Sequence, residues 1–247
     1  MDKKFLETWQ SDRFFFTSGH LKIIACLTMF LSHLAQSYLL YILGYIRIAD
    51  LSMLIGRVAM PIYCFMVAQG MVLTKDKKSY LKRLFIFALV SEIPYDLAFR
   101  NTIFEYYNQN VIFTLFLGAL LIYIWQVIED KSFKVYIKIS LMLIIAILFC
   151  FLAQMMFTDY SYKGIIAISL LYLSFSNKYL TALVLFLSFY FEAYVTGYSL
   201  YIPFIVYLSI PLILLYNGKR GKYSKFGFYL FYPGHLMLIY FLKLVLL

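Results

Sequence analysis

Long apolar stretches follow one another along almost the whole chain, and they constrain its fold more than any other feature. A helix needs roughly 20 apolar residues to cross the hydrocarbon core of a bilayer. Hydrophobic residues make up 64% of the 247 residues and charged residues 14%, whereas soluble domains carry about 45–50% and about 25%. A globule of this length cannot bury so much apolar surface. The composition therefore excludes a soluble enzyme, a disulfide-stapled secreted domain and a disordered chain.

The apolar stretches predict an all-α, polytopic transmembrane bundle with about nine spans. The runs are continuously apolar rather than alternating, which favours helices over the strands of a membrane barrel. The charged and aromatic segment 1–20 has no small-residue cleavage site, so we expect it to lie along the cytoplasmic interface. Residues 21–247 then form a single membrane domain. The predicted spans are 21–44, 51–74, 83–99, 111–129, 135–157, 164–176, 179–196, 199–216 and 226–246.

The basic residues indicate an orientation with the N-terminus in the cytoplasm and the C-terminus outside. With nine spans, 17 of the 22 lysines and arginines fall in cytoplasmic segments and three in outer loops. This split follows the positive-inside rule and predicts a multi-pass protein of the cytoplasmic membrane. The net charge of +10 suits the anionic inner leaflet rather than nucleic acid. The cytoplasmic set is Lys3, Lys4, Arg13, Lys22, Lys75, Lys77, Lys78, Lys82, Arg83, Lys131, Lys134, Lys138, Lys178, Lys219, Arg220, Lys222 and Lys225; the outer set is Arg47, Arg100 and Lys163.

Six ionisable residues lie well inside predicted spans, all between the predicted midplane and the outer half. A charge within a span costs at least about 2.5–3.5 kcal/mol, so such residues usually mark a functional site. Glu92 and Asp96 are four residues apart, which places both carboxylates on one helix face. Arg57 needs an anionic partner in lipid, and the three carboxylates are the candidates. The six residues are His33, Arg57, Glu92, Asp96, Glu192 and His235.

Each of these residues also has a purely structural interpretation. Arg57, Glu92 and Asp96 can form an ion-pair network without chemistry, and His235 can be a core histidine bonded to a carbonyl. His33 is the stronger candidate for chemistry, because a neutral imidazole works as a general base close to pH 7.

Several kinds of site are disfavoured by the motifs. The three cysteines are isolated in apolar spans, with no CxxC motif and no His/Cys cluster, so we expect neither a disulfide framework nor a metal. No GxSxG, HExxH or P-loop sequence occurs, which disfavours intramembrane serine or zinc proteolysis and nucleotide hydrolysis. All five prolines fall inside predicted spans, as ordinary kinks or as irregular helices around an internal cavity.

Five segments follow one another in an order that is specific to a family. They are LKIIACLTMFLSHLAQ (21–36), GRVAMPIYCFMVAQG (56–70), YLKRLFIFALVSEIPYDLAF (80–99), NVIFTLFLGALLIYI (110–124) and FYPGHLMLIYF (231–241). Together they resemble the TraX family, known for N-terminal acetylation of conjugative pilin, and through it the wider group of transmembrane acyltransferases. R-x3-P-I-x2-F and SEIPYDLAF are the most specific parts. One departure is Ser32 before His33, where the family usually has aspartate.

The resemblance implies an acyltransferase that moves an acetyl group from cytoplasmic acetyl-CoA to an acceptor at the outer side. We expect the acceptor to be an amine of a pilin-like or other peptide, or alternatively a hydroxyl of a surface glycan. His33 would take the acceptor proton, and Arg57 would polarise the thioester carbonyl or stabilise the oxyanion. The predicted catalytic set is His33, Arg57, Glu92, Asp96 and His235, with Glu92 and Asp96 holding Arg57 or the acceptor ammonium; the predicted set for the donor phosphates is Lys75, Lys77, Lys78, Lys82 and Arg83.

Two other classes of protein fit parts of the pattern. A proton-coupled transporter also uses buried Glu, Asp and His, but it predicts two related halves, and 21–99 and 135–216 show no such pairing. An assembly or scaffold subunit of a secretion system would carry the charges as a structural network. Such a subunit would tolerate His33→Ala without loss of function.

Overall fold

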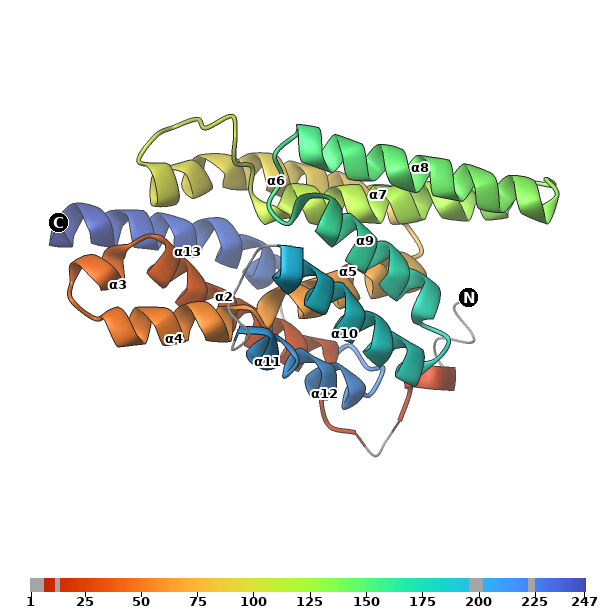
Figure 1. Cartoon of the computed structure of the whole chain (residues 1–247), viewed down its shortest axis with the longest axis horizontal. Helices are drawn as coiled ribbons and strands as arrows, with labels where there is room; N and C mark the ends of the chain where they lie inside the picture. Colours follow the sequence, from red (N-terminus) through yellow and green to blue (C-terminus); the bar gives the residue numbers. More distant parts are fainter. Residues whose placement is uncertain (1–6, 12–13, 196–201, 222–224) are drawn as a thin grey trace.

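The structure of the chain is a computed structural model that describes residues 7–11, 14–195, 202–221 and 225–247. Within these ranges it is all helical, with two isolated bridges, Phe16–Tyr216 and Gln109–Thr158, in place of strands. The helices in Figure 1 are α2 (Ser18–Gln36), α3 (Leu39–Ile42), α4 (Ile46–Gly56), α5 (Ala59–Leu73), α6 (Lys77–Arg100), α7 (Val111–Glu129), α8 (Val135–Met155), α9 (Ser161–Ser174), α10 (Lys178–Val195), α11 (Ile202–Val206), α12 (Ser209–Leu214) and α13 (Lys225–Leu246). The all-α prediction is therefore confirmed for the described residues.

Six helical segments of the described chain are long and apolar enough to cross a membrane. The 24-residue α6 is not among them and carries charged residues at both ends and within its length. Two further apolar helices are shorter, Ser161–Ser174 and Phe204–Leu214. Residues 199–201, the start of the predicted eighth span, lie outside the described residues. The six candidate spans are Ser18–Gln36, Ile46–Leu73, Val111–Glu129, Val135–Met155, Lys178–Val195 and Gly227–Leu246.

Polar side chains cap the N-termini of α2, α6 and α7. Thr17 and His20 cap each other's backbone N–H at the start of α2. At the start of α6, the Asp76 carboxylate accepts from the Ser79 N–H at 3.0 Å, and the hydrogen bonds from Ser79 hold the pKa of Asp76 below its usual range. Asn110 accepts from the Ile112 N–H at 3.0 Å and caps α7. These short polar side chains explain where the apolar stretches become helices.

The first two predicted spans differ from the helices of the structure, and both differences lie near the ionisable residues. The first span was predicted as 21–44, but α2 ends at Gln36, because Tyr38 takes a left-handed conformation with a φ of 63° and starts the short α3. The second span, predicted as 51–74, extends over 46–73 and is broken after Gly56. Pro61 has no N–H to donate to the carbonyl of Arg57, which explains the break at this position. His33 therefore lies in the last turn of its helix, and Arg57 lies at a break.

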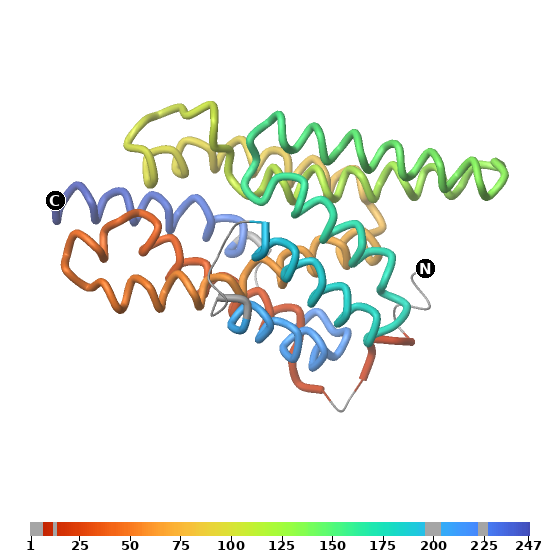
Figure 2. The backbone as a smooth tube through the Cα atoms, viewed as in Figure 1, coloured from red at the N-terminus to blue at the C-terminus, as the bar shows by residue number. Residues whose placement is uncertain are grey.

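The core of the bundle is built around α5, which packs against α2, α7, α9 and α12. Figure 1 and Figure 2 show α8 at the edge of the molecule beside α7, and Ala153 is its one buried residue. The N-terminal segment contributes Trp9, which is fully buried and donates from its indole nitrogen to the Phe175 carbonyl at 3.0 Å. The described part of segment 1–20 thus packs into the bundle; residues 1–6 and 12–13 lie outside the described residues.

Candidate active site

A cavity of about 780 Å³ lies between α2, α5, α6, α7 and α13. This volume is within the range of small-molecule sites, which is about 300–1,000 Å³. The walls are mostly apolar, and their residues come from all along the chain, from Ser18 in α2 to Tyr232 in α13. We call it the central cavity.

Four cations line one end of the central cavity, and we call them the basic mouth: Lys22, Lys75, Arg83 and Arg220. Hydrogen bonds from the Ser18 hydroxyl and the Gly19 N–H to the Arg220 carbonyl hold Arg220 at the start of α2. Lys75, Arg83 and Arg220 are exposed, so this end reaches the surface. Of the five cations predicted to bind donor phosphates, Lys75 and Arg83 line the cavity, whereas Lys77, Lys78 and Lys82 are not among its lining residues.

One face of α2 runs along the central cavity toward the predicted base. Lys22, Cys26 and Met29 line the cavity at helical spacing, and His33 follows four residues later on the same face. At 1.5 Å per residue, the axial distance from Lys22 to His33 is about 16 Å. Phe231 and Tyr232 of α13 also line the cavity and lie one turn before His235. The two histidines therefore lie beyond the end of the cavity that is opposite the basic mouth.

The structure brings His33 and His235 together although they are 202 residues apart in sequence. Nδ1 of His33 lies 2.8 Å from Nε2 of His235, and the two rings stack with their centroids 5.0 Å apart. His33 is 8% exposed and His235 is 5% exposed. Nδ1 of His235 lies 2.7 Å from the carbonyl oxygen of Phe231. The histidines thus form a buried chain of two hydrogen bonds.

The direction of this chain follows from its carbonyl end. A carbonyl oxygen only accepts, so Nδ1 of His235 must carry the hydrogen. In an uncharged His235 ring, Nε2 is then the acceptor, and Nδ1 of His33 donates to it. An uncharged His33 is left with a lone pair on Nε2. This is the tautomer that a general base requires.

Arg57 pairs with Glu192 of α10, one of the three carboxylates expected as its partner, at 3.7 Å. Its guanidinium also lies beside Tyr160 and Asp159 in the turn between α8 and α9. Burial raises the pKa of Asp159 to about 6, although the Tyr160 N–H and Arg57 act in the opposite direction. The break at Arg57 is thus linked to α10 and to the turn before α9.

Glu92 and Asp96 lie on one buried face of α6, as predicted from their spacing, and both accept hydrogen bonds from the segment 105–110 that precedes α7. Asp96 accepts from the Glu105 N–H at 2.8 Å. Glu92 accepts from the backbone N–H of Asn110 at 3.3 Å and from its side-chain amide. A carboxylate at a helix N-terminus is favoured by the helix dipole. These hydrogen bonds position the start of α7, and the role of the pair toward Arg57 or an acceptor ammonium stays a prediction.

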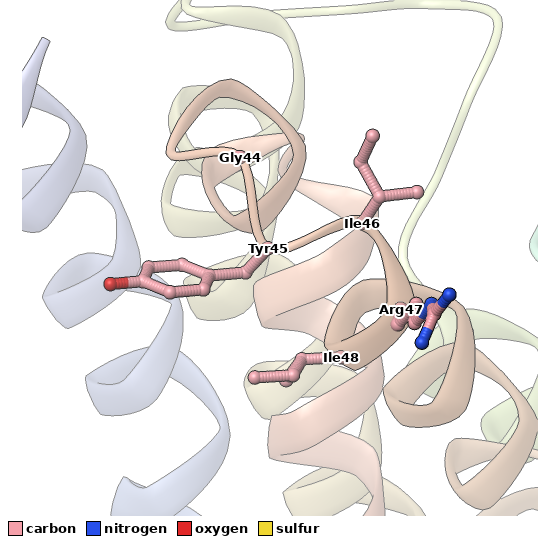
Figure 3. Close-up of a pocket in the computed structure, with 5 residues that line it drawn as sticks. All are labelled: Gly44, Tyr45, Ile46, Arg47 and Ile48. Carbon is pink, nitrogen blue, oxygen red and sulfur yellow. The ribbon is translucent and has the colours of Figure 1, made fainter.

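A second hollow, shown in Figure 3, lies at the turn between α3 and α4. It has a volume of about 390 Å³ and is lined by Gly44, Tyr45, Ile46, Arg47 and Ile48, all of them exposed. Tyr45 and Arg47 point to opposite sides of the turn in Figure 3. A hollow formed by one exposed turn brings no chemical groups together, so the central cavity is the better site.

The match to a family model decides the relationship of this chain to known proteins. The model described as "TraX protein" matches residues 18–243. The chain belongs to the TraX family. A relative in Dichelobacter nodosus, named "probable fimbrial assembly protein FimC, serogroup H1", is 28% identical over 243 residues, which cover 91% of this chain and 94% of the relative. No solved structure matches the chain.

Sequence reasoning missed several residues that this TraX family member places at the site. Lys22 was assigned to the cytoplasmic face by charge alone, with no signal that it lines one cavity with Lys75 and Arg83. Arg220 belongs to the segment Lys219–Lys225, which the sequence places beside Lys75–Arg83 at the inner face. Tyr232 is one of 24 tyrosines, and its place in the FYPGH segment was the one available signal. In the described residues, no group of three or more His, Cys, Asp or Glu could hold a metal ion.

Proposed function

We propose that this protein is an integral membrane acyltransferase that moves an acetyl group from acetyl-CoA, entering at the basic mouth, to an amine presented from the opposite side. The observation that carries the proposal is the arrangement of the central cavity, which has four cations at its open end and a pair of hydrogen-bonded histidines beyond the other. Cations at an opening suit the phosphates of coenzyme A, and the apolar walls suit its long acyl-bearing arm.

The proposed topology has nine spans, with the basic mouth in the cytoplasm and the C-terminus outside. In this topology the six apolar spans would be joined by three further crossings, made by α6, α9 and α11–α12. The clustering of Lys22, Lys75, Arg83 and Arg220 at one end of the cavity supports this orientation, because basic residues favour the cytoplasmic side. The donor would then enter from the compartment that supplies acetyl-CoA, and the acceptor from outside.

In the proposed reaction, the acceptor nitrogen attacks the thioester carbonyl carbon and its proton passes to Nε2 of His33. The C–S bond breaks, and the thiolate of coenzyme A takes up that proton. His235 holds His33 in the tautomer with a free Nε2. The name of the relative as a fimbrial assembly protein supports a pilin-like peptide as acceptor.

Purified protein in lipid nanodiscs tests the proposal, with radiolabelled acetyl-CoA as donor and membranes from a strain lacking the gene as the source of acceptor. We expect label to reach protein as a hydroxylamine-resistant amide. An ester-linked label would indicate a hydroxyl acceptor such as a surface glycan. Absence of any protein-dependent transfer, with folded protein, would contradict the acyltransferase.

Replacing two cations of the basic mouth tests where the donor binds. Lys75→Gln combined with Arg83→Gln should weaken coenzyme A binding about a hundredfold or more at low salt, since two charge-assisted contacts are lost and each is worth about 1.5–3 kcal/mol. The effect should shrink at high salt. Equilibrium dialysis with labelled coenzyme A measures it.

A matched pair of substitutions is available on the same segment. Lys77→Gln combined with Lys78→Gln removes the same charge, but neither residue lines the central cavity. This variant should bind coenzyme A nearly as the unmodified protein does. Equal weakening by both pairs would indicate a general electrostatic effect and would contradict a phosphate site at the basic mouth.

A further inference from the structure

The hydroxyl of Tyr232 is a polar group without a hydrogen-bond acceptor, at the end of the central cavity that is opposite the basic mouth. Tyr232 is 7% exposed and lines the cavity. Its hydroxyl finds no hydrogen-bond acceptor among the described residues. A buried polar group left without a partner costs about 1–3 kcal/mol. An orphaned donor at the wall of a ligand-sized cavity therefore points to an acceptor atom on a ligand.

The start of α7 lies next to this hydroxyl. The backbone N–H of Val111 is beside the Tyr232 oxygen, and Val111 itself lines the cavity. The next two N–H groups, of Ile112 and Phe113, already bond to Asn110. A helix N-terminus carries a partial positive charge, and its first N–H groups have no partner within the helix. Glu92 already accepts from Asn110 at the start of α7, so the Tyr232 hydroxyl is the group at this wall with a hydrogen left to donate.

The same tyrosine contacts the histidine pair. The Tyr232 ring centroid lies 6.0 Å from that of His33 and 5.5 Å from that of His235. The predicted proton acceptor, His33, and a hydrogen-bond donor for developing negative charge, Tyr232, are therefore in contact, and Tyr232 also lines the cavity. Acyl transfer needs both groups near one carbonyl carbon.

We propose that the Tyr232 hydroxyl, whose oxygen faces the Val111 N–H, donates to the thioester carbonyl oxygen and stabilises the oxyanion of the acetyl transfer, an inference that rests on the proposed function. When the acceptor nitrogen bonds to the carbonyl carbon, the C=O π pair moves to oxygen, which accepts the hydrogen bond from Tyr232. The pair returns as the C–S bond breaks, and coenzyme A leaves as thiolate. The acceptor proton travels through His33 to that sulfur, so Tyr232 keeps its own proton.

This assignment differs from the expectation that Arg57 polarises the carbonyl. Arg57 is paired with Glu192 and is not among the residues that line the central cavity. Tyr232 meets the requirements that Arg57 lacks, since it lines the cavity, its hydroxyl proton has no acceptor, and it contacts the predicted base.

Tyr232→Phe tests the inference in the transfer assay described above, because it removes only the hydroxyl. Removing one donor to an oxyanion costs about 10²–10³ in kcat. We expect a loss of that size with an unchanged KM for acetyl-CoA, unchanged coenzyme A binding and an unchanged melting temperature. Tyr207→Phe is the matched control, since the Tyr207 hydroxyl is also buried without a partner but lies outside the cavity lining. Its kcat should not change.

The outcomes separate this inference from the proposed function. If the unmodified protein transfers acetyl and Tyr232→Phe has the same kcat, the oxyanion role is wrong while the acyltransferase stands. A raised KM or a lower melting temperature with unchanged kcat would assign Tyr232 to binding or packing and would overturn the inference. If the unmodified protein transfers nothing, the proposed function itself fails.

Discussion

At the residue scale, the protonation of His33 depends on His235. The Phe231 carbonyl requires a hydrogen on Nδ1 of His235, and this in turn directs the hydrogen of His33 to its own Nδ1. Phe99 packs edge-on against the His33 ring, with centroids 5.3 Å apart, and limits its rotation. We therefore infer that His33 is the base and that His235 is a positioning residue.

The two histidines should differ in their effect on the rate of transfer. His33→Ala should lower kcat by about 10²–10⁴, the usual contribution of a general base, while coenzyme A binding survives. His235→Ala should cost less, because His33 keeps its nitrogen but loses its preferred tautomer. The double variant should be no slower than His33→Ala alone, since residues that act as a unit are not additive. Additive losses in single-turnover rates would show that the histidines act separately.

At the scale of elements, α2 and α4 approach each other closely beside the histidine pair. A Cβ atom added at Gly56 would lie 2.1 Å from the Cβ of Ser32, the residue before His33. This contact requires glycine, because no side chain fits between the two helices at this point. Gly56, where α4 contacts α2, directly precedes Arg57, where the helix is broken.

Gly56→Ala should therefore separate α2 from α4 and displace His33. We expect a lower melting temperature in detergent and a loss of transfer, because overpacking costs about 1–3 kcal/mol. Gly234→Ala is the comparison, since a Cβ at Gly234, which lies inside α13, meets nothing within 4 Å. That variant should melt at the same or a slightly higher temperature, as alanine favours helix. A Gly56→Ala protein as stable as Gly234→Ala would argue against tight packing here.

At the scale of the whole molecule, the proposed orientation places the basic mouth inside and the 101–110 loop outside. Cysteines at Thr102 and Lys78, both exposed, test this in a background with Cys26, Cys64 and Cys150 replaced by serine. In intact cells, a membrane-impermeant maleimide should label Thr102→Cys at once and Lys78→Cys only after the cells are opened. Labelling of both positions from the same side would contradict the nine-span arrangement.

Local chemistry in the sequence determined the class of this protein. Apolar runs predict helices in lipid wherever they fall, so the all-helical fold and the buried ionisable residues could be predicted from the sequence. The helical spacing of Glu92 and Asp96 placed them on one face, and the structure agrees. The family could also be identified, because its motifs are contiguous segments.

The tertiary structure decided which buried groups meet. His33 and His235 are 202 residues apart, and Arg57 could have paired with any of three carboxylates until the packing of α10 selected Glu192. The span ends near the site also depended on single residues, such as Pro61 and the left-handed Tyr38, whose effects hydropathy does not register. Hydropathy reflects the free energy of transferring each segment into lipid, one segment at a time. A hydrogen-bonded site depends instead on which helices pack against one another.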